Sequence, residues 1–116
     1  MTFEVWADPG FDQELAKFSR ADQARIEAAL VSYAVNPVRH PKATHLAGAR
    51  VIRSFRLRVG PFRVVGTLFV SQKAILVTTV FRKKRNEDYQ AAAARHEKRL
   101  LAQVPPLSDY LRDLGF

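Results

Sequence analysis

The sequence contains no cysteine. Disulfide bonds, Cys-ligated zinc sites and thiol nucleophiles are therefore excluded, and a reducing compartment suits the chain. The longest apolar runs fall far short of the about 20 residues that span a bilayer, and the N-terminus lacks the basic and apolar regions of a signal peptide. No Gly-rich phosphate loop occurs, which argues against nucleotide hydrolysis. These absences favour a soluble, cytoplasmic protein.

Carboxylates are missing from the central half of the chain. From Ala28 to Asn86, 59 residues hold twelve Lys or Arg and no Asp or Glu, so this block carries +12 in a chain whose net charge is +8. A surface that needs only solubility mixes both signs. The block therefore predicts an anionic partner, such as nucleic acid, a membrane surface or an acidic protein. The alternative interpretation is a solvated basic surface on an ordinary domain.

The N-terminal part predicts one strand followed by two helices. Residues 2–7 alternate and include aromatic and β-branched side chains, which is typical of a strand. Asp8 is a candidate cap for a helix that extends to Phe18. Ser19 caps a second helix, which Asn36-Pro37 ends. Residues 38–49 show no sustained period and are expected to form a connecting loop.

The C-terminal part predicts three strands and a helix. The strands cover residues 50–59, 62–70 and 74–82, and their short connections indicate an antiparallel meander that joins the first strand in one sheet. A helix follows from Glu87, with Asn86 as its cap, and Val104-Pro105-Pro106 is expected to stop it. Ser108 is then expected to cap a last short helix in a tail of residues 103–116. The length of 116 residues fits a single α+β domain over residues 1–116.

The first hairpin of the meander places like charges opposite one another. A two-residue turn at Gly60-Pro61 makes Arg58 face Arg63 and turns one set of side chains toward the core: Phe55, Leu57, Val59, Phe62, Val64 and Leu68. The other face carries Arg56, Arg58 and Arg63, and an uninterrupted register adds Arg82. Opposed like charges cost a few tenths to about 1 kcal/mol. Because arginine binds phosphate through a planar fork, we expect this cationic face to hold a phosphodiester.

Two segments of this region resemble a known family. The stretch F-R-L-R-V-G-P-F-R-V-V, followed by a strand and then by F-R-K-K-R-N-E-D-Y, is similar to the RelE/ParE superfamily of bacterial and archaeal toxins, and most closely to its RelE branch. The preceding H-L-A-G and the two helices that end at N-P match the order of elements in that family. The resemblance covers roughly residues 2–92.

The resemblance implies a microbial-RNase-like RelE fold and the toxin of a type II toxin-antitoxin system. Toxins of the RelE type cut messenger RNA in the ribosomal A site without a metal or cofactor, and an antitoxin protein silences them in a hetero-oligomer. By position in the motifs, the catalytic residues would be Arg56, Arg63, Lys83 and Tyr89. Further contacts to messenger or ribosomal RNA would come from Arg53, Arg58, Arg82, Lys84 and Arg85.

These residue types can be compared with the needs of RNA cleavage by a 2′-hydroxyl. The reaction needs a proton acceptor, cations around the phosphate and a proton donor for the leaving oxygen. Arg56 and Arg63 suit the cationic role, and Lys83 suits either stabilisation or donation. Many relatives carry a histidine where this chain has Phe81, which leaves Tyr89 as the titratable base. Its reference pKa of about 10 would have to fall under the surrounding positive charge.

Two other functions remain open at this stage. A ParE-like toxin that inhibits DNA gyrase would need no nuclease residues, and a basic RNA-binding domain would need no catalysis. His40, His45 and His96 have no spacing typical of metal ligands. His96 lies seven residues after Tyr89 and is expected on the same helix face, together with Ala93 and Leu100.

Overall fold

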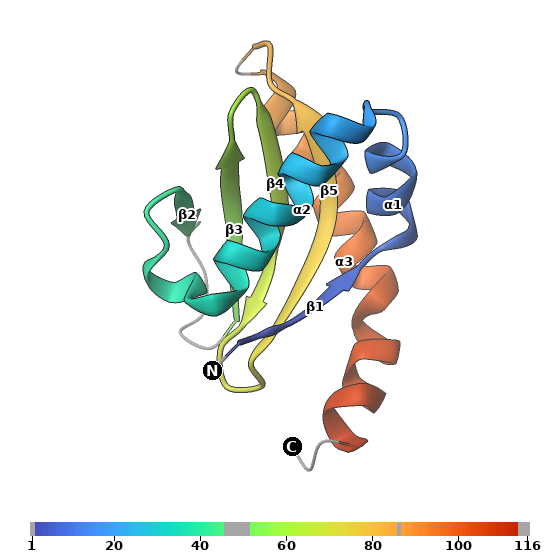
Figure 1. The fold of residues 1–116 in the computed structure, drawn as a ribbon. Helices are drawn as coiled ribbons and strands as arrows, with labels where there is room; N and C mark the ends of the chain where they lie inside the picture. Colours follow the sequence, from blue (N-terminus) through green and yellow to red (C-terminus); the bar gives the residue numbers. More distant parts are fainter. Residues whose placement is uncertain (1, 46–51, 86, 114–116) are drawn as a thin grey trace.

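The chain folds around one five-stranded sheet. The computed structural model describes residues 2–45, 52–85 and 87–113, with side chains for 2–44, 54–85 and 88–103. The elements in chain order are β1 (Glu4–Ala7), α1 (Pro9–Leu15), α2 (Arg20–Val35), η1 (Pro37–Arg39), β2 (Ala43–His45), β3 (Ile52–Val59), β4 (Phe62–Phe69), β5 (Ala74–Arg82) and α3 (Glu87–Asp113). The strand order is β1-β5-β4-β3-β2, in which β1 is parallel to β5 and the other neighbours are antiparallel (Figure 1). The predicted α+β class is confirmed.

The two helix caps predicted near the N-terminus are present. The Asp8 carboxylate accepts a hydrogen bond from the Gly10 N–H at 2.7 Å, and the Ser19 hydroxyl accepts one from the Asp22 N–H at 3.1 Å. Each cap satisfies a backbone donor that the first turn of a helix leaves free. The first helix ends at Leu15, earlier than the predicted Phe18.

The prediction of a connecting loop over residues 38–49 is wrong at residues 38–39 and 43–45, and residues 46–49 lie outside the described residues. A 3-10 turn, η1, follows α2, and β2 pairs with β3 from Ala43 opposite Leu57 to His45 opposite Phe55. Three residues are too few to show a strand period, and this strand exists because of its pairing with a distant segment. Sequence periodicity could not reveal it.

The prediction that Val104-Pro105-Pro106 ends the last helix is also wrong. The helix α3 is continuous from Glu87 to Asp113, so the separate short helix capped by Ser108 does not form. Proline fixes φ near −65°, which is compatible with helical backbone, although each proline removes one donor. The predicted cap, Asn86, lies outside the described residues. Within the part of the chain that is described, no helix is long and apolar enough to cross a membrane.

One face of the sheet packs against α2 and forms the main core (Figure 1). Ile26 and Tyr33 of α2 are fully buried against the inward side chains of the β3–β4 hairpin. The six hairpin residues predicted to face the core are all buried: Phe55, Leu57, Val59, Phe62, Val64 and Leu68. The assumed register is therefore confirmed, with Val59 opposite Phe62 and Arg58 opposite Arg63.

The opposite face is only partly covered, by α3 (Figure 1). Leu100 and Trp6 pack there against Phe69 and Leu76 of the sheet. Ala92 is the buried alanine on the contact face of α3, whereas the predicted Ala93 is exposed. The helix therefore covers β4 and β5 and leaves the outer part of this face, over β3 and β2, open.

Candidate functional site

A β-bulge decides which side chains reach the open face. From Phe69 opposite Ala74, the pairing of β4 with β5 runs regularly to Gly66 opposite Val77 and then shifts, so that Thr78 is the extra residue. Beyond the bulge Arg63 lies opposite Phe81. A bulge of one residue reverses the faces of the residues that follow it. Phe81 is thereby turned to the side of Arg63.

The bulge also corrects the predicted position of Arg82. Arg82 pairs with Phe62 and its guanidinium carbon lies 5.4 Å from the centre of that ring, on the α2 side of the sheet. The expectation that Arg82 shares a face with Arg63 assumed an uninterrupted register and is wrong. Among the described side chains, three strand arginines and not four lie on the open face, namely Arg56, Arg58 and Arg63.

His96 connects α3 to three strands next to the bulge. Its side chain is 8% exposed, and its Nδ1 lies 2.6 Å from the Thr78 hydroxyl, which donates to the Val65 carbonyl. Its Nε2 lies 3.1 Å from the Ser54 hydroxyl and 3.3 Å from that of Thr67. Burial lowers the pKa of His96, so the ring is neutral at pH 7, with Nδ1 donating and Nε2 accepting. The histidine fixes α3 on the sheet two turns from Tyr89.

Tyr89 is surrounded by cations on the open face. The Nε of Arg63 donates a hydrogen bond of 3.0 Å to the Tyr89 hydroxyl. The Arg56 guanidinium carbon lies 4.2 Å from the centre of the Tyr89 ring, and the Lys83 ammonium lies 5.2 Å from it. The edge of Phe81 completes the contact, with ring centres 5.9 Å apart. The structure thus brings together all four residues predicted as catalytic.

Backbone carbonyls hold Arg63 in this position. Its Nη1 donates to the carbonyl oxygens of Gly60 and Phe62, both at 2.8 Å. The guanidinium is therefore oriented by the hairpin turn at one end and by Tyr89 at the other. A preorganised cation needs little rearrangement when it meets an anion.

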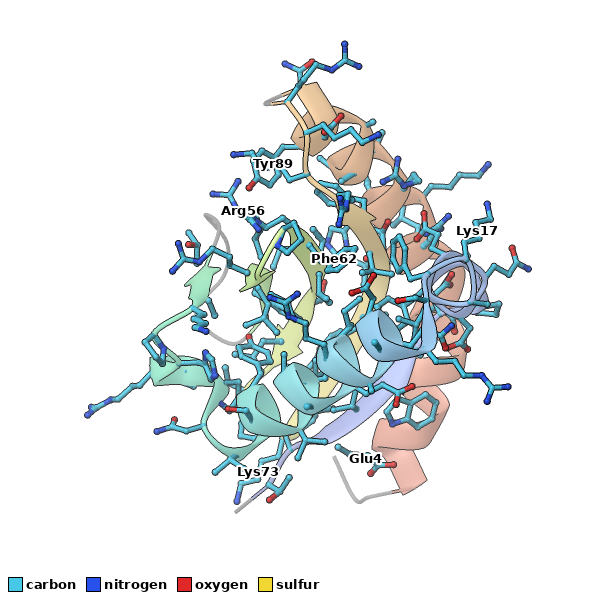
Figure 2. The ribbon with its side chains drawn as sticks, turned by 45° about the horizontal axis from the view of Figure 1, so that its top comes forward. Glu4, Lys17, Arg56, Phe62, Lys73 and Tyr89 are labelled. Atoms are coloured by element: carbon cyan, nitrogen blue, oxygen red, sulfur yellow. The ribbon has the colours of Figure 1, made fainter. Side chains whose placement is uncertain are left out.

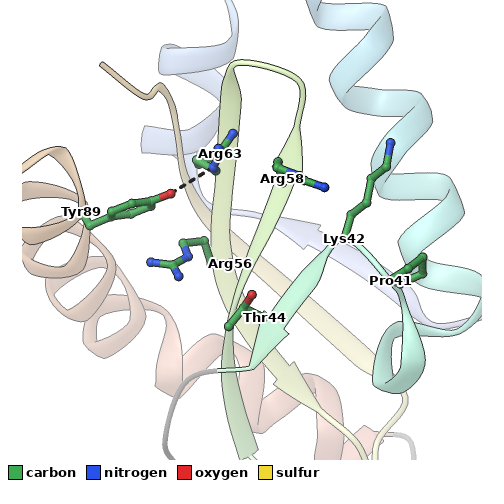
Figure 3. Close-up of a pocket in the computed structure, with 7 residues that line it drawn as sticks. All are labelled: Pro41, Lys42, Thr44, Arg56, Arg58, Arg63 and Tyr89. Carbon is green, nitrogen blue, oxygen red and sulfur yellow. Dashed lines mark hydrogen bonds between the residues drawn. The ribbon is translucent and has the colours of Figure 1, made fainter. Parts of the chain in front are cut away.

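Arg56, Arg63 and Tyr89 line an open cleft of about 320 Å³ (Figure 3). We call it the arginine cleft and define it by Pro41, Lys42, Thr44, Arg56, Arg58, Arg63 and Tyr89. Arg56 lies opposite Val65 on one side and Thr44 on the other, so like charges are opposed only at Arg58 and Arg63. Among the described residues that line the cleft, four are cationic and none is acidic.

The remaining predicted RNA contacts lie at different places. Lys84 and Arg85 are exposed, and their backbone N–H groups donate to the Asp88 carboxylate at 2.7 and 2.9 Å. These two hydrogen bonds lower the pKa of Asp88. The side chain of Arg53 lies outside the described residues. Figure 2 shows Arg56 beside Tyr89 in the upper part of the view and Lys73 far from both at its lower edge, so the basic block does not form a single surface.

Sequence reasoning missed Lys42 and Thr44. Both belong to the segment that was expected to be a loop, and they reach the cleft because β2 pairs with β3. The positive charge of Lys42 within the carboxylate-free block was the only available signal, and it does not locate the side chain.

No protein-family model and no curated protein matches the chain by sequence. Solved structures do match it. The RelE–RelB complex from Pyrococcus horikoshii OT3 contains a chain that is 22% identical with a TM-score of 0.67, and the match covers 73% of this chain and 99% of that one. A double mutant of Escherichia coli RelE in the free state is 20% identical with a TM-score of 0.61, over 82% and 98% of the two chains. The toxin-antitoxin complex RelBE2 from Mycobacterium tuberculosis gives 15% identity and a TM-score of 0.61, over 72% and 93%.

The matches cover the three neighbouring chains almost completely and between 72% and 82% of this chain. The resemblance noted in the hairpin and in the basic run before Tyr89 is therefore accompanied by a similar fold over most of the chain. The chain has the fold of the RelE toxins.

Proposed function

We propose that this chain is the toxin of a type II toxin-antitoxin system and a ribosome-dependent endoribonuclease that cleaves messenger RNA. The observation that carries the proposal is the position of Tyr89, which three cations contact at the wall of an open cleft whose described lining residues include no acid. The RelE-like fold supports the same function.

The proposed reaction uses the 2′-hydroxyl of the RNA as nucleophile. Tyr89, as the general base, takes the proton of the 2′-hydroxyl while the 2′-oxygen bonds to phosphorus and the bond to the 5′-oxygen breaks. Lys83 gives a proton to the leaving 5′-oxygen. The products are a 2′,3′-cyclic phosphate and a 5′-hydroxyl end, and Arg56 and Arg63 stabilise the charge that accumulates on the phosphate oxygens.

The same set of residues accounts for the proposed dependence on the ribosome. Phe81 stands where many relatives have a histidine, and its ring contacts Tyr89 without offering a titratable group. With Tyr89 and Lys83 as its proton-transfer groups and no histidine beside them, the reaction depends strongly on alignment of the 2′-oxygen with phosphorus. Holding reactants in a productive geometry contributes up to about 7–11 kcal/mol, and the ribosome would supply this by fixing the messenger RNA.

The proposed protein partner is an antitoxin. Two of the structural neighbours are complexes of a RelE-type toxin with its antitoxin. An acidic segment of such a partner would be attracted to the arginine cleft, since the described cleft residues carry only positive charge.

A reconstituted translation system tests the proposal. Purified protein is added, and the ends of the messenger RNA are mapped. We expect cuts that follow the codon phase, and we expect Arg56→Gln to reduce the cleavage rate by about 100-fold, the scale for losing one group that stabilises a transition state. Arg82→Gln is the matched control, because it removes the same charge from the opposite face of the sheet.

Two results would contradict the proposal. Intact RNA together with halted DNA supercoiling in a parallel gyrase assay would indicate a ParE-like toxin. RNA that is bound but not cleaved, on ribosomes or off them, would indicate a binding domain. Tyr89→Phe then tests the assigned base: it keeps the ring between the cations and should still lose cleavage.

A further inference from the structure

A second hollow lies on the other side of the β2–β3 edge, between that edge and α2. Its volume is about 480 Å³. The floor is apolar and includes Ala29 and Leu57, while Arg25, His40, Lys42 and Arg58 stand around it. We call this hollow the edge pocket. Among its described lining residues three are permanently cationic and none is acidic, so it too selects for an anionic ligand.

The edge pocket is continuous with the arginine cleft. Pro41, Lys42 and Arg58 line both. The reason is the short length of β2, whose pairing with β3 starts at Ala43 opposite Leu57. Beyond that pair the Arg58 N–H donates to the Lys42 carbonyl at 3.0 Å, and the chain of Lys42 leads away toward α2. The surface that lines the two hollows therefore continues around the edge of the sheet between Lys42 and Arg58.

Arg25 brings a charge from outside the carboxylate-free block. It projects from α2 to the β3–β4 turn, where a Cβ at Gly60 would collide with its guanidinium. Gly60 has φ of +58°, a conformation that favours glycine in any case. Because Gly60 has no side chain, there is room for Arg25 at the mouth of the edge pocket, which Arg58 also lines.

His40 adds a ring to this site. The Lys42 N–H donates to its Nδ1 at 3.2 Å, so its Nε2 carries the proton and donates to the Ser32 hydroxyl, also at 3.2 Å. Its ring stands edge-on to Tyr33, with centres 5.7 Å apart. Imidazole and guanidinium planes are surfaces on which unpaired RNA bases stack. An apolar floor with such planes at its rim suits a nucleobase better than a phosphate alone.

We propose that the edge pocket binds a nucleotide of the same RNA strand that the arginine cleft holds, on the flank of the scissile phosphate. Arg25 and Lys42 contact its phosphate, and the His40 ring and the apolar floor contact its base. This inference rests on the proposed function, because it requires RNA in the arginine cleft. It assigns Arg25, which the motifs of the hairpin and of the basic run do not include.

The test compares short and long single-stranded RNA. Fluorescent 2′-O-methyl oligonucleotides, which lack the nucleophile, are titrated by anisotropy as a trinucleotide and a hexanucleotide, at salt low enough for the trinucleotide to bind. Arg25→Ala should weaken hexanucleotide binding roughly tenfold and leave the trinucleotide unchanged. For the hexanucleotide, the magnitude of the slope of log binding constant against log salt concentration should decrease by about 0.7 in Arg25→Ala, which corresponds to the loss of one phosphate contact. Arg20→Ala, on the same helix, is the control and should change neither.

Three outcomes would overturn the proposal. If Arg25→Ala and Arg20→Ala bind the hexanucleotide with equal affinity, Arg25 does not contact the RNA. If Arg25→Ala weakens the binding of both oligonucleotides equally, Arg25 acts through the overall positive potential of the protein and not through a contact of its own. Unchanged RNA binding with loss of binding to a Glu-rich peptide of the same net charge makes the pocket a protein-docking site. Failure of the proposed function has a separate readout, the absence of messenger RNA cleavage in the translation system, whereas the binding of these uncleavable oligonucleotides reports only on the contact of Arg25.

Discussion

Two groups of arginines, one on α3 and the other on the β3–β4 hairpin, have opposite surroundings. Toward the C-terminal half of α3, Arg99 donates to the Glu14 carboxylate at 2.7 Å and to the Thr78 carbonyl at 2.8 Å, and Arg95 lies 3.3 Å from the same carboxylate. On the hairpin, the partners of Arg63 among the described residues are two carbonyls and the Tyr89 hydroxyl, and Arg56 contacts the Tyr89 ring. One group lies on α3 and the other on the sheet, and they differ in whether a carboxylate contacts them.

The difference separates arginines that hold the fold from arginines that remain available to a ligand. Glu14 comes from α1 and also accepts from the Thr79 hydroxyl at 2.8 Å, so it joins α1, β5 and α3. Asp8 extends the network by accepting from Gln103 at 2.9 Å. Hydrogen-bonded charges with partners contribute to stability, whereas a cation left without one retains its affinity for an external anion. The absence of acidic residues from the hairpin therefore leaves its arginines available to bind an anionic ligand.

The largest expected effect on folding comes from removing the acid at the centre of the first group. Glu14→Gln keeps the shape of the side chain and leaves Arg95 and Arg99 without their shared carboxylate. Because the Glu14 side chain is 19% exposed, water replaces the lost contact only in part. We expect the free energy of unfolding to fall by about 2 kcal/mol, which lowers the melting temperature by about 8 °C.

Arg56→Gln is the counterpart of this variant in thermal denaturation. It removes a charge that no described carboxylate neutralises, and its melting temperature should stay near that of the wild type. Equal losses in Glu14→Gln and Arg56→Gln would show that both groups of arginines are structural, and the contrast between them would be wrong.

Most of the hairpin could be predicted from the sequence, because its cause is local. A two-residue turn at Gly60-Pro61 and the alternation of side chains determine which residues face the core and set Arg58 against Arg63. The motif around Tyr89 also predicted the four residues that meet there. The bulge at Thr78 had no comparable signal, since threonine fits a regular strand equally well. Its position depends on His96 and on long-range pairing, and it moved Arg82 to the other face.

The second prediction concerns His96, which anchors the covered part of the face. Burial lowers the pKa of His96 below the usual 6.5. His96 therefore binds a proton at about pH 6.5 in the unfolded chain but only at lower pH in the folded chain. The contribution of the buried, neutral His96 to the free energy of unfolding is full above about pH 6.5 and is lost as the pH falls below it. Between the unfolded and folded pKa values the loss is up to about 1.4 kcal/mol per pH unit. Urea denaturation from pH 7.5 to 5 measures it.

His96→Gln is the reference variant for the pH series, since glutamine can hydrogen-bond to the strand hydroxyls but does not titrate in this range. The difference in unfolding free energy between wild type and variant should shrink toward acid pH. The pKa of His40 is also lowered, so both proteins are compared in a His40→Gln background. A difference that stays constant from pH 7.5 to 5 would mean that His96 accepts a proton without leaving its hydroxyl partners.

The smallest expected effect is a gain in stability at the cationic hairpin. Arg58 is exposed and directly opposite Arg63, whereas Arg56 is opposite Val65. Arg58→Thr removes the only opposed like charges of the pair of strands and introduces a residue that favours strands, so it should raise the free energy of unfolding by a few tenths to about 1 kcal/mol. Added salt should reduce the gain, because it screens the repulsion in the wild type. Arg56→Thr should give no gain, as it relieves no opposed charge and removes the contact with the Tyr89 ring. A gain in both variants, or one that salt does not change, would mean that strand propensity and not charge repulsion limits the stability of this hairpin.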